Sequence, residues 1–112
     1  MLLLSKAQLE QRLGISLNQL SDLCQQWGIR EMALFGSILR DDFKPDSDID
    51  FLISFELSAP QGLLTLAKIK SQLEILLNYP VDIAIKDSIN NSDNWIRRQE
   101  ILTTAQTIYE QR

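Results

Sequence analysis

Residues 33–54 are A-L-F-G-S-I-L-R-D-D-F-K-P-D-S-D-I-D-F-L-I-S, and the fold is decided in this stretch. An apolar run over residues 32–35 ends at Gly36-Ser37, and a second apolar run follows Asp48 and Asp50. Short apolar runs bounded by turn residues are typical of buried strands, so we expect two strands that bracket a polar loop. Because side chains two residues apart in a strand share a face, Asp48 and Asp50 should point the same way.

This pair of acids predicts a cation site. Two carboxylates on one face of a strand repel each other unless a cation lies between them. Mg²⁺ is usually held by one or two carboxylates together with substrate phosphates. Five of the nine aspartates lie between Asp41 and Asp50, so the acidity of the chain is concentrated where such a site would need it.

The other half of the stretch suits a phosphate. Gly36 can adopt the backbone angles of a sharp strand-to-helix turn and allows a ligand to approach the main chain. Ser37 is a favoured N-cap residue, and the N-terminus of a helix attracts phosphate groups. Arg40, one turn later, would add a planar set of donors to the same anion.

Gly36-Ser37, followed after ten residues by Asp48-Ile49-Asp50, resembles the signature of the DNA polymerase β-like nucleotidyltransferase superfamily. The fuller pattern F-G-S-x-x-R…P-D-S-D-I-D-x-L-I is similar to that of its minimal nucleotidyltransferase branch, and the resemblance covers roughly residues 17–109. Members of the branch often carry alanine and glycine where this chain has Leu39 and Asp41. The alternative interpretation is a capped turn followed by solvated aspartates.

A third acid, Asp82, lies in a predicted strand over residues 81–85 that is otherwise apolar. A lone acid in a buried strand is costly unless it is paired or ligated, so Asp82 is the natural third carboxylate. The strand follows a helix predicted over residues 63–78 from leucines at helical spacing. In the resembling family, the third metal-binding aspartate occupies such a strand after such a helix.

The remaining chain adds helices on either side of this core. Residues 1–30 predict two short helices, because Ser5 with Gln8 and Ser16 with Gln19 both have the spacing of a capping box. Residues 95–111 predict a last helix. We therefore expect one domain over residues 1–112, of α/β (α+β) class, with 31–112 as the catalytic core and C-terminal helix. The resemblance implies the polymerase β-like nucleotidyltransferase fold, a small mixed sheet covered by helices.

The composition of the chain excludes several kinds of catalytic and metal site and argues against some partners. The chain has no histidine and one cysteine, Cys24, which excludes histidine-dependent triads, an internal disulfide and cysteine-based zinc clusters. A formal net charge of −4 argues against nucleic acid or an anionic membrane as a partner. No apolar run reaches the roughly 18 residues of a membrane span, so a cytoplasmic location is expected.

The resemblance implies transfer of AMP from ATP, or from another nucleoside triphosphate. Asp48, Asp50 and Asp82 would hold two Mg²⁺ ions, with Mn²⁺ as a substitute, while Gly36, Ser37 and Arg40 would bind the nucleotide. The implied acceptor is a tyrosine of a HEPN-type ribonuclease toxin, which makes the chain an antitoxin. Two other hypotheses stay open: a non-catalytic antitoxin that covers its partner, and a helix-turn-helix DNA-binding regulator formed by residues 1–30.

Overall fold

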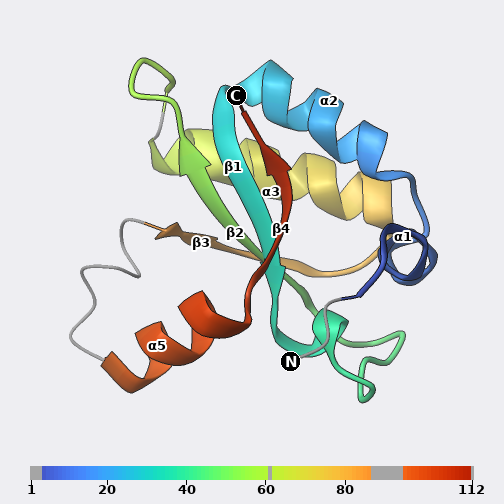
Figure 1. The fold of residues 1–112 in the computed structure, drawn as a ribbon. Coiled ribbons are helices and arrows are strands. Elements are labelled where there is room, and N and C mark those ends of the chain that lie inside the picture. The colour runs from blue at the N-terminus through green and yellow to red at the C-terminus, as the bar shows by residue number, and fades with distance from the viewer. Residues whose placement is uncertain (1–3, 61, 87–94, 112) are drawn as a thin grey trace.

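The computed structural model describes residues 4–60, 62–86 and 95–111. Within these ranges a four-stranded sheet has the order β3-β2-β1-β4; β1 is antiparallel to β2 and β4, and β2 is parallel to β3 (Figure 1). The strands are β1 (Ile29–Phe35), β2 (Ile49–Phe55), β3 (Val81–Ile85) and β4 (Gln106–Glu110), and the helices are α1 (Lys6–Leu13), α2 (Leu17–Trp27), the 3₁₀ helix η1 (Gly36–Leu39), α3 (Leu63–Leu77) and α5 (Trp95–Thr104). The expected class, a small mixed sheet covered by helices, is confirmed.

The two N-terminal helices begin as the sequence predicted. The side chain of Ser5 accepts a hydrogen bond from the N–H of Gln8 at 3.1 Å, and the side chain of Gln8 accepts one from the N–H of Ser5 at 2.8 Å. Gln19 makes the corresponding bond to the N–H of Ser16 at 3.2 Å. These bonds satisfy N–H groups that the first turn of a helix leaves without partners. No helix in the described ranges is both long enough and apolar enough to cross a membrane.

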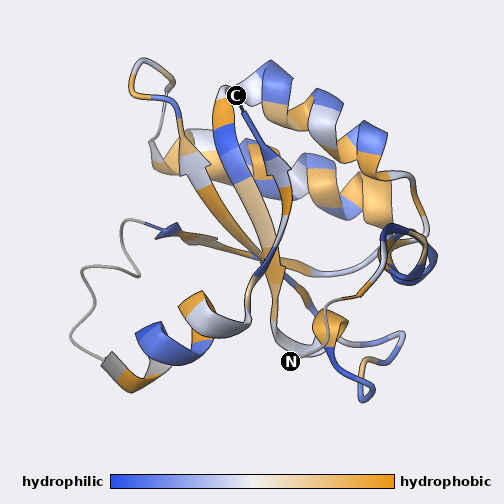
Figure 2. Ribbon diagram, viewed as in Figure 1, coloured by the Kyte–Doolittle hydropathy of each residue, from blue (hydrophilic) through white to orange (hydrophobic). Residues whose placement is uncertain are grey.

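Alternation along the strands divides the apolar interior into two clusters of different size. Met32, Leu34, Phe51 and Ile53 belong to the larger cluster, together with buried residues of α1, α2 and α3. The smaller cluster, on the other face of the sheet, joins Ala33 and Leu52 to Ile101 of α5. Figure 1 shows α2 and α3 together on one side of the strands and α5 on the other, and Figure 2 shows apolar residues along β1, β2 and α3.

The predicted helix over residues 95–111 is wrong beyond Thr104. The hydroxyls of Thr103 and Thr104 donate to the carbonyls of Gln99 and Glu100, both at 2.6 Å, in the last turn of α5. The chain then continues as β4, which pairs with β1. Thr, Ile and Tyr favour strands, and the open edge of β1 offers backbone partners that a longer helix would leave unused.

The larger cluster makes a prediction about Cys24. Its sulfur lies 3.8 Å from that of Met32, and burial raises the pKa of the thiol to about 12. Roughly one thiol in ten thousand would then be ionised at pH 8, and the thiolate is the reactive form. We expect Ellman's reagent to react slowly with the native chain and to find one thiol per chain after unfolding in urea. Rapid reaction of the native chain would contradict this packing.

Candidate functional site

The predicted site residues converge at one edge of the sheet. Because β1 runs antiparallel to β2 and β3 runs parallel to it, the end of β1 meets the beginnings of β2 and β3. Asp50 pairs in register with Phe35 of β1 on one side and with Asp82 of β3 on the other. Residues paired across neighbouring strands point to the same face. Asp50 and Asp82 therefore share the face that carries Ala33 and Leu52, which is the face of α5.

Asp48 and Asp82 flank this central acid at the surface. Asp48 precedes β2 and is exposed, and its carbonyl oxygen lies 3.5 Å from the hydroxyl of Ser37. The prediction that Asp82 is buried is wrong, because β3 is an edge strand and its carboxylate is exposed. Its placement beside Asp50 thus comes from strand register, and the cost of burying a charge does not apply.

Gly36 and Asp50 bring the two halves of the motif together. Gly36 has φ of +78°, and a Cβ atom at this position would collide with the Asp50 carboxylate oxygen Oδ2. Any side chain at residue 36 would therefore meet both a left-handed backbone and an occupied space. The glycine lets the carboxylate lie directly against the main chain of the turn.

The strand-to-helix turn predicted at Gly36-Ser37 leads into a short 3₁₀ helix. This is the four-residue η1, in which the N–H of Arg40 donates to the carbonyl of Ser37 at 2.9 Å. Phe35 occupies the N-cap position, so the prediction of Ser37 as N-cap is wrong. The left-handed Gly36 starts the turn one residue earlier, which places Ser37 inside it with its hydroxyl toward Asp48.

A pocket of about 290 Å³ opens between this turn and α5. Arg40 contributes a cation to its wall, although the guanidinium Nε also lies 3.1 Å from the Asp42 carboxylate. Both partners of that ion pair are more than half exposed, so the pair is weak and the cation can turn to an anionic ligand. The pocket is lined by Phe35, Gly36, Ser37, Arg40, Asp50, Glu100, Ile101 and Thr104.

Sequence reasoning missed the contribution of α5. Glu100, Ile101 and Thr104 line the pocket, although more than sixty residues separate them from Gly36 in the sequence. The apolar periodicity of the helix indicated that Ile101 packs on the sheet. Apolar periodicity identifies which face of a helix is buried. It does not say which end of the sheet the helix covers, because tertiary packing decides that.

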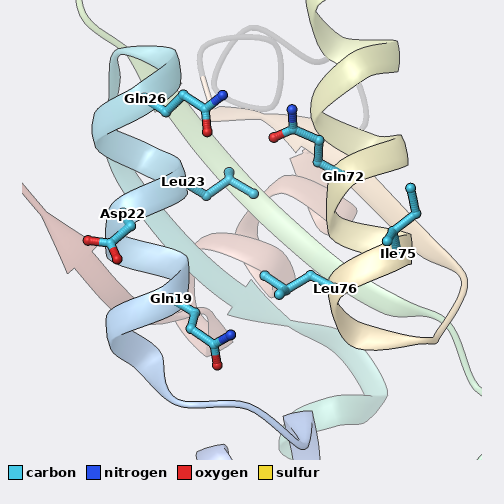
Figure 3. A pocket seen from close by; sticks show the side chains of 7 residues that line it. All are labelled: Gln19, Asp22, Leu23, Gln26, Gln72, Ile75 and Leu76. Carbon is cyan, nitrogen blue, oxygen red and sulfur yellow. The ribbon is translucent and has the colours of Figure 1, made fainter.

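A larger groove, of about 410 Å³, lies between α2 and α3 (Figure 3). Leu23 and Leu76 point toward each other across it, and Gln26 and Gln72 stand at one end. Asp22 is the acid in its lining. Because α2 and α3 cover the face opposite Asp50, this groove does not belong to the site of the motif.

Comparison with known proteins agrees with this geometry. The nucleotidyltransferase domain family matches residues 18–106 of the chain, which include every predicted site residue. The chain belongs to the nucleotidyltransferase family. The protein adenylyltransferase MntA of Thermococcus cleftensis is 39% identical to it over 70 residues, which cover 62% of this chain and 69% of that protein.

Solved structures of similar proteins share the fold. One assigned to the minimal nucleotidyltransferases is 29% identical, with a TM-score of 0.65, over 91% of this chain and 94% of that chain. A second chain comes from the complex of a tri-AMPylated HEPN toxin with its MNT antitoxin from Shewanella oneidensis. It is 17% identical, with a TM-score of 0.58, over 84% of this chain and 69% of that chain. The expected nucleotidyltransferase fold is confirmed.

Nucleotidyltransferases of this family generally use divalent metal ions, and the acids of this chain suit such an ion. Among the described residues, no group of three or more carboxylate, histidine or cysteine side chains lies close enough together to hold a metal ion. Mg²⁺ seldom occupies a cage made of protein alone, because it keeps water molecules and binds substrate phosphates. Exposed carboxylates on either side of Asp50, next to an open pocket, fit that type of open site.

The contact between Gly36 and Asp50 predicts the effect of replacing the glycine. In Gly36→Ala, the left-handed backbone should cost about 1–2 kcal/mol. The collision with the Asp50 carboxylate should cost about 1–3 kcal/mol more. The free energy of unfolding, measured by urea denaturation, reports the sum.

Gly14 provides the matched control. It has the same φ of +78°, but a Cβ atom there has no neighbour within 4 Å, so Gly14→Ala measures the backbone cost alone. In an Asp50→Ala background, Gly36→Ala should cost no more than Gly14→Ala, because the Cβ of residue 50 would remain at an ordinary distance of 3.5 Å. Equal costs for the two glycine variants in the wild-type background would contradict the contact.

Proposed function

We propose that this chain is a protein adenylyltransferase, which transfers AMP from ATP to a hydroxyl group of a partner protein. The observation that carries the proposal is the position of Asp50. It lies against the Gly36 turn on one side, pairs with Asp82 on the other and lines an open pocket. The relative from Thermococcus cleftensis bears the name of this activity.

The turn is proposed to bind the triphosphate. Gly36 lines the pocket and begins the turn, and the hydroxyl of Ser37 can donate to a phosphate oxygen in place of its long contact with the Asp48 carbonyl. Arg40 offers a planar donor group to the same oxygens, since its pair with Asp42 is exposed and weak. These three residues would orient the α-phosphate toward the acids.

Asp48, Asp50 and Asp82 are proposed as the metal ligands, holding two Mg²⁺ ions for which Mn²⁺ can substitute. Such ions, when bound, polarise phosphoryl oxygens and neutralise the charge that develops on them. In the ion-free chain, the cluster of like charges is tolerated because Asp48 and Asp82 remain in water. Asp50, half-buried against Gly36, fixes where the cluster is centred.

The transfer is an in-line displacement at the α-phosphorus. The acceptor hydroxyl oxygen forms a bond to phosphorus, the bond from phosphorus to the bridging oxygen of the β-phosphate breaks, and pyrophosphate leaves. The hydroxyl proton would pass to Asp82, whose carboxylate is exposed, or to a water molecule beside it. The products are AMP-modified acceptor and pyrophosphate.

The proposed acceptor is a tyrosine of a HEPN-type ribonuclease toxin, so that the chain acts as its antitoxin. The pocket is open, and two of the three acids are exposed, which suits an acceptor delivered by another protein. The similar structure from Shewanella oneidensis is described as a complex with an AMPylated HEPN toxin. We place the reaction in the cytoplasm because it consumes ATP.

The rival hypotheses receive less support. A non-catalytic antitoxin would not need two paired acids on one face of the sheet, next to a pocket lined by the Gly36 turn and Arg40. A helix-turn-helix regulator would insert α2 into DNA, but α2 contains no lysine or arginine and packs its buried residues against the sheet. Phosphate contacts supply much of the affinity for DNA, so such a helix is poorly suited to the task.

The proposal predicts the mass of the partner. A HEPN-type protein co-expressed with the wild-type chain should gain one or more AMP units by intact-mass analysis. Co-expression with Asp48→Asn, Asp50→Asn or Asp82→Asn should give no gain, because removing one charged ligand weakens ion binding while the apolar core is untouched. Asp46→Asn, in the same loop and also exposed, is the control and should modify the partner as the wild type does.

The ribonuclease activity of the toxin distinguishes catalytic neutralisation from neutralisation by binding alone. The toxin's ribonuclease activity should return in the aspartate variants even where the two proteins still co-purify. A partner that stays unmodified beside the wild-type chain and is still inactive would support the non-catalytic antitoxin.

A further inference from the structure

Arg12 connects the N-terminal helix to the turn of the site. It lies in the last turn of α1, and its guanidinium Nη1 donates to two main-chain carbonyls, that of Ile38 at 2.8 Å and that of Arg40 at 2.7 Å. The other terminal nitrogen, Nη2, lies 3.6 Å from the Asp41 carboxylate. One side chain therefore spans the end of η1 and the residues that follow it.

These bonds set the orientation of two peptide groups. In a trans peptide the C=O of one residue and the N–H of the next point in opposite directions. With the carbonyls of Ile38 and Arg40 turned toward Arg12, the N–H groups of Leu39 and Asp41 must point away from α1. The turn has little internal support, because a four-residue 3₁₀ helix has weak hydrogen-bond geometry. Arg12 supplies that support from a different element.

The hydrogen bonds from Arg12 to the two carbonyls stabilise the turn more than its ion pair with Asp41 does. The Arg12 side chain is only 24% exposed, whereas that of Asp41 is fully exposed, so solvent screens the attraction between the two charges. The bonds to the carbonyls are assisted by the charge of the guanidinium, which has several donors in a rigid plane. Lysine, with a single ammonium group, would not reproduce that geometry.

We propose that Arg12 is a positioning residue for the nucleotide-binding turn: it holds η1 in place, so that Gly36, Ser37 and Arg40 form the pocket wall before nucleotide arrives. The inference rests on the proposed function, because it assigns the turn to nucleotide binding. Arg12 lies outside residues 18–106, the part that matches the family. In this chain the site therefore depends on a helix beyond the matched domain.

The test combines nucleotide affinity with local exchange. In Arg12→Ala the dissociation constant of a fluorescent ATP analogue with Mg²⁺ should rise about tenfold, which is the scale of one lost charge-assisted hydrogen bond. Amides of residues 37–43 should exchange with deuterium faster in the nucleotide-free variant, while those of β1 and β2 keep their protection. Free guanidinium, at a concentration too low to unfold the chain, should restore part of the affinity. Arg12→Lys should recover less than half of the nucleotide affinity that Arg12→Ala loses.

Two matched variants distinguish the positioning role of Arg12 from the loss of an ion pair or of a positive charge on α1. Asp41→Asn removes the ion pair but keeps both carbonyl bonds, and Lys6→Ala removes an exposed cation from the same helix. For both variants the dissociation constant of the nucleotide should stay within about twofold of the wild-type value, because exposed charges contribute little energy. Wild-type affinity in Arg12→Ala, or unchanged exchange of residues 37–43, would overturn the proposal. Failure of the wild-type chain to bind nucleotide would instead overturn the proposed function, and the exchange measurement would still report on Arg12.

Discussion

The Asp50 carboxylate occupies the space that a side chain at residue 36 would need, and the arrangement of the site depends on this contact. It requires a glycine with a left-handed backbone at the end of β1, and it requires β1 and β2 to pair so that Phe35 lies opposite Asp50. A shift of one residue in this register would turn Asp50 to the other face, into the larger apolar cluster. The pairing of β1 with β2 therefore fixes both the fold and the position of the acid.

The division of the interior explains why the site lies where it does. The larger cluster, beneath α1, α2 and α3, contains most of the buried apolar side chains in the described part of the chain. On the other face, small residues such as Ala33 and Ala84 and, within the described ranges, one short helix leave room for a polar pocket at the strand ends. Asp50 and Asp82 then lie on the face where a charge does not have to be buried in the main core.

Local signals in the sequence were sufficient for the parts that local chemistry controls. Ser5 with Gln8 predicted the start of α1, and the two short apolar runs around the motif predicted β1 and β2. Predictions from the sequence failed where residues far away in the sequence decide the secondary structure or the exposure of a side chain. Residues 106–110 pair with an open strand edge instead of extending α5, and Asp82 lies on an edge strand that water reaches.

The roles of Glu100 and Arg12 also came from tertiary structure. Glu100 reaches the pocket because α5 packs through Ile101 on Ala33 and Leu52. Arg12 reaches the turn because α1 ends beside the carbonyls of Ile38 and Arg40. Neither residue belongs to the motif, and neither has a characteristic spacing from it. Sequence alone therefore identified the acids and the turn, but not the side chains that surround and support them.

Asp48, Asp50 and Asp82 are proposed to form one divalent-ion site beside the Gly36 turn. Paramagnetic broadening of backbone amide signals by substoichiometric Mn²⁺ in the nucleotide-free chain tests this directly. We expect the signals of residues 36–37, 48–50 and 82 to broaden first, while those of Gln19 and Gln72 of the α2–α3 groove remain sharp. Preferential broadening around other acids, such as Glu31 and Glu110, or equal broadening over the whole chain, would contradict this proposal.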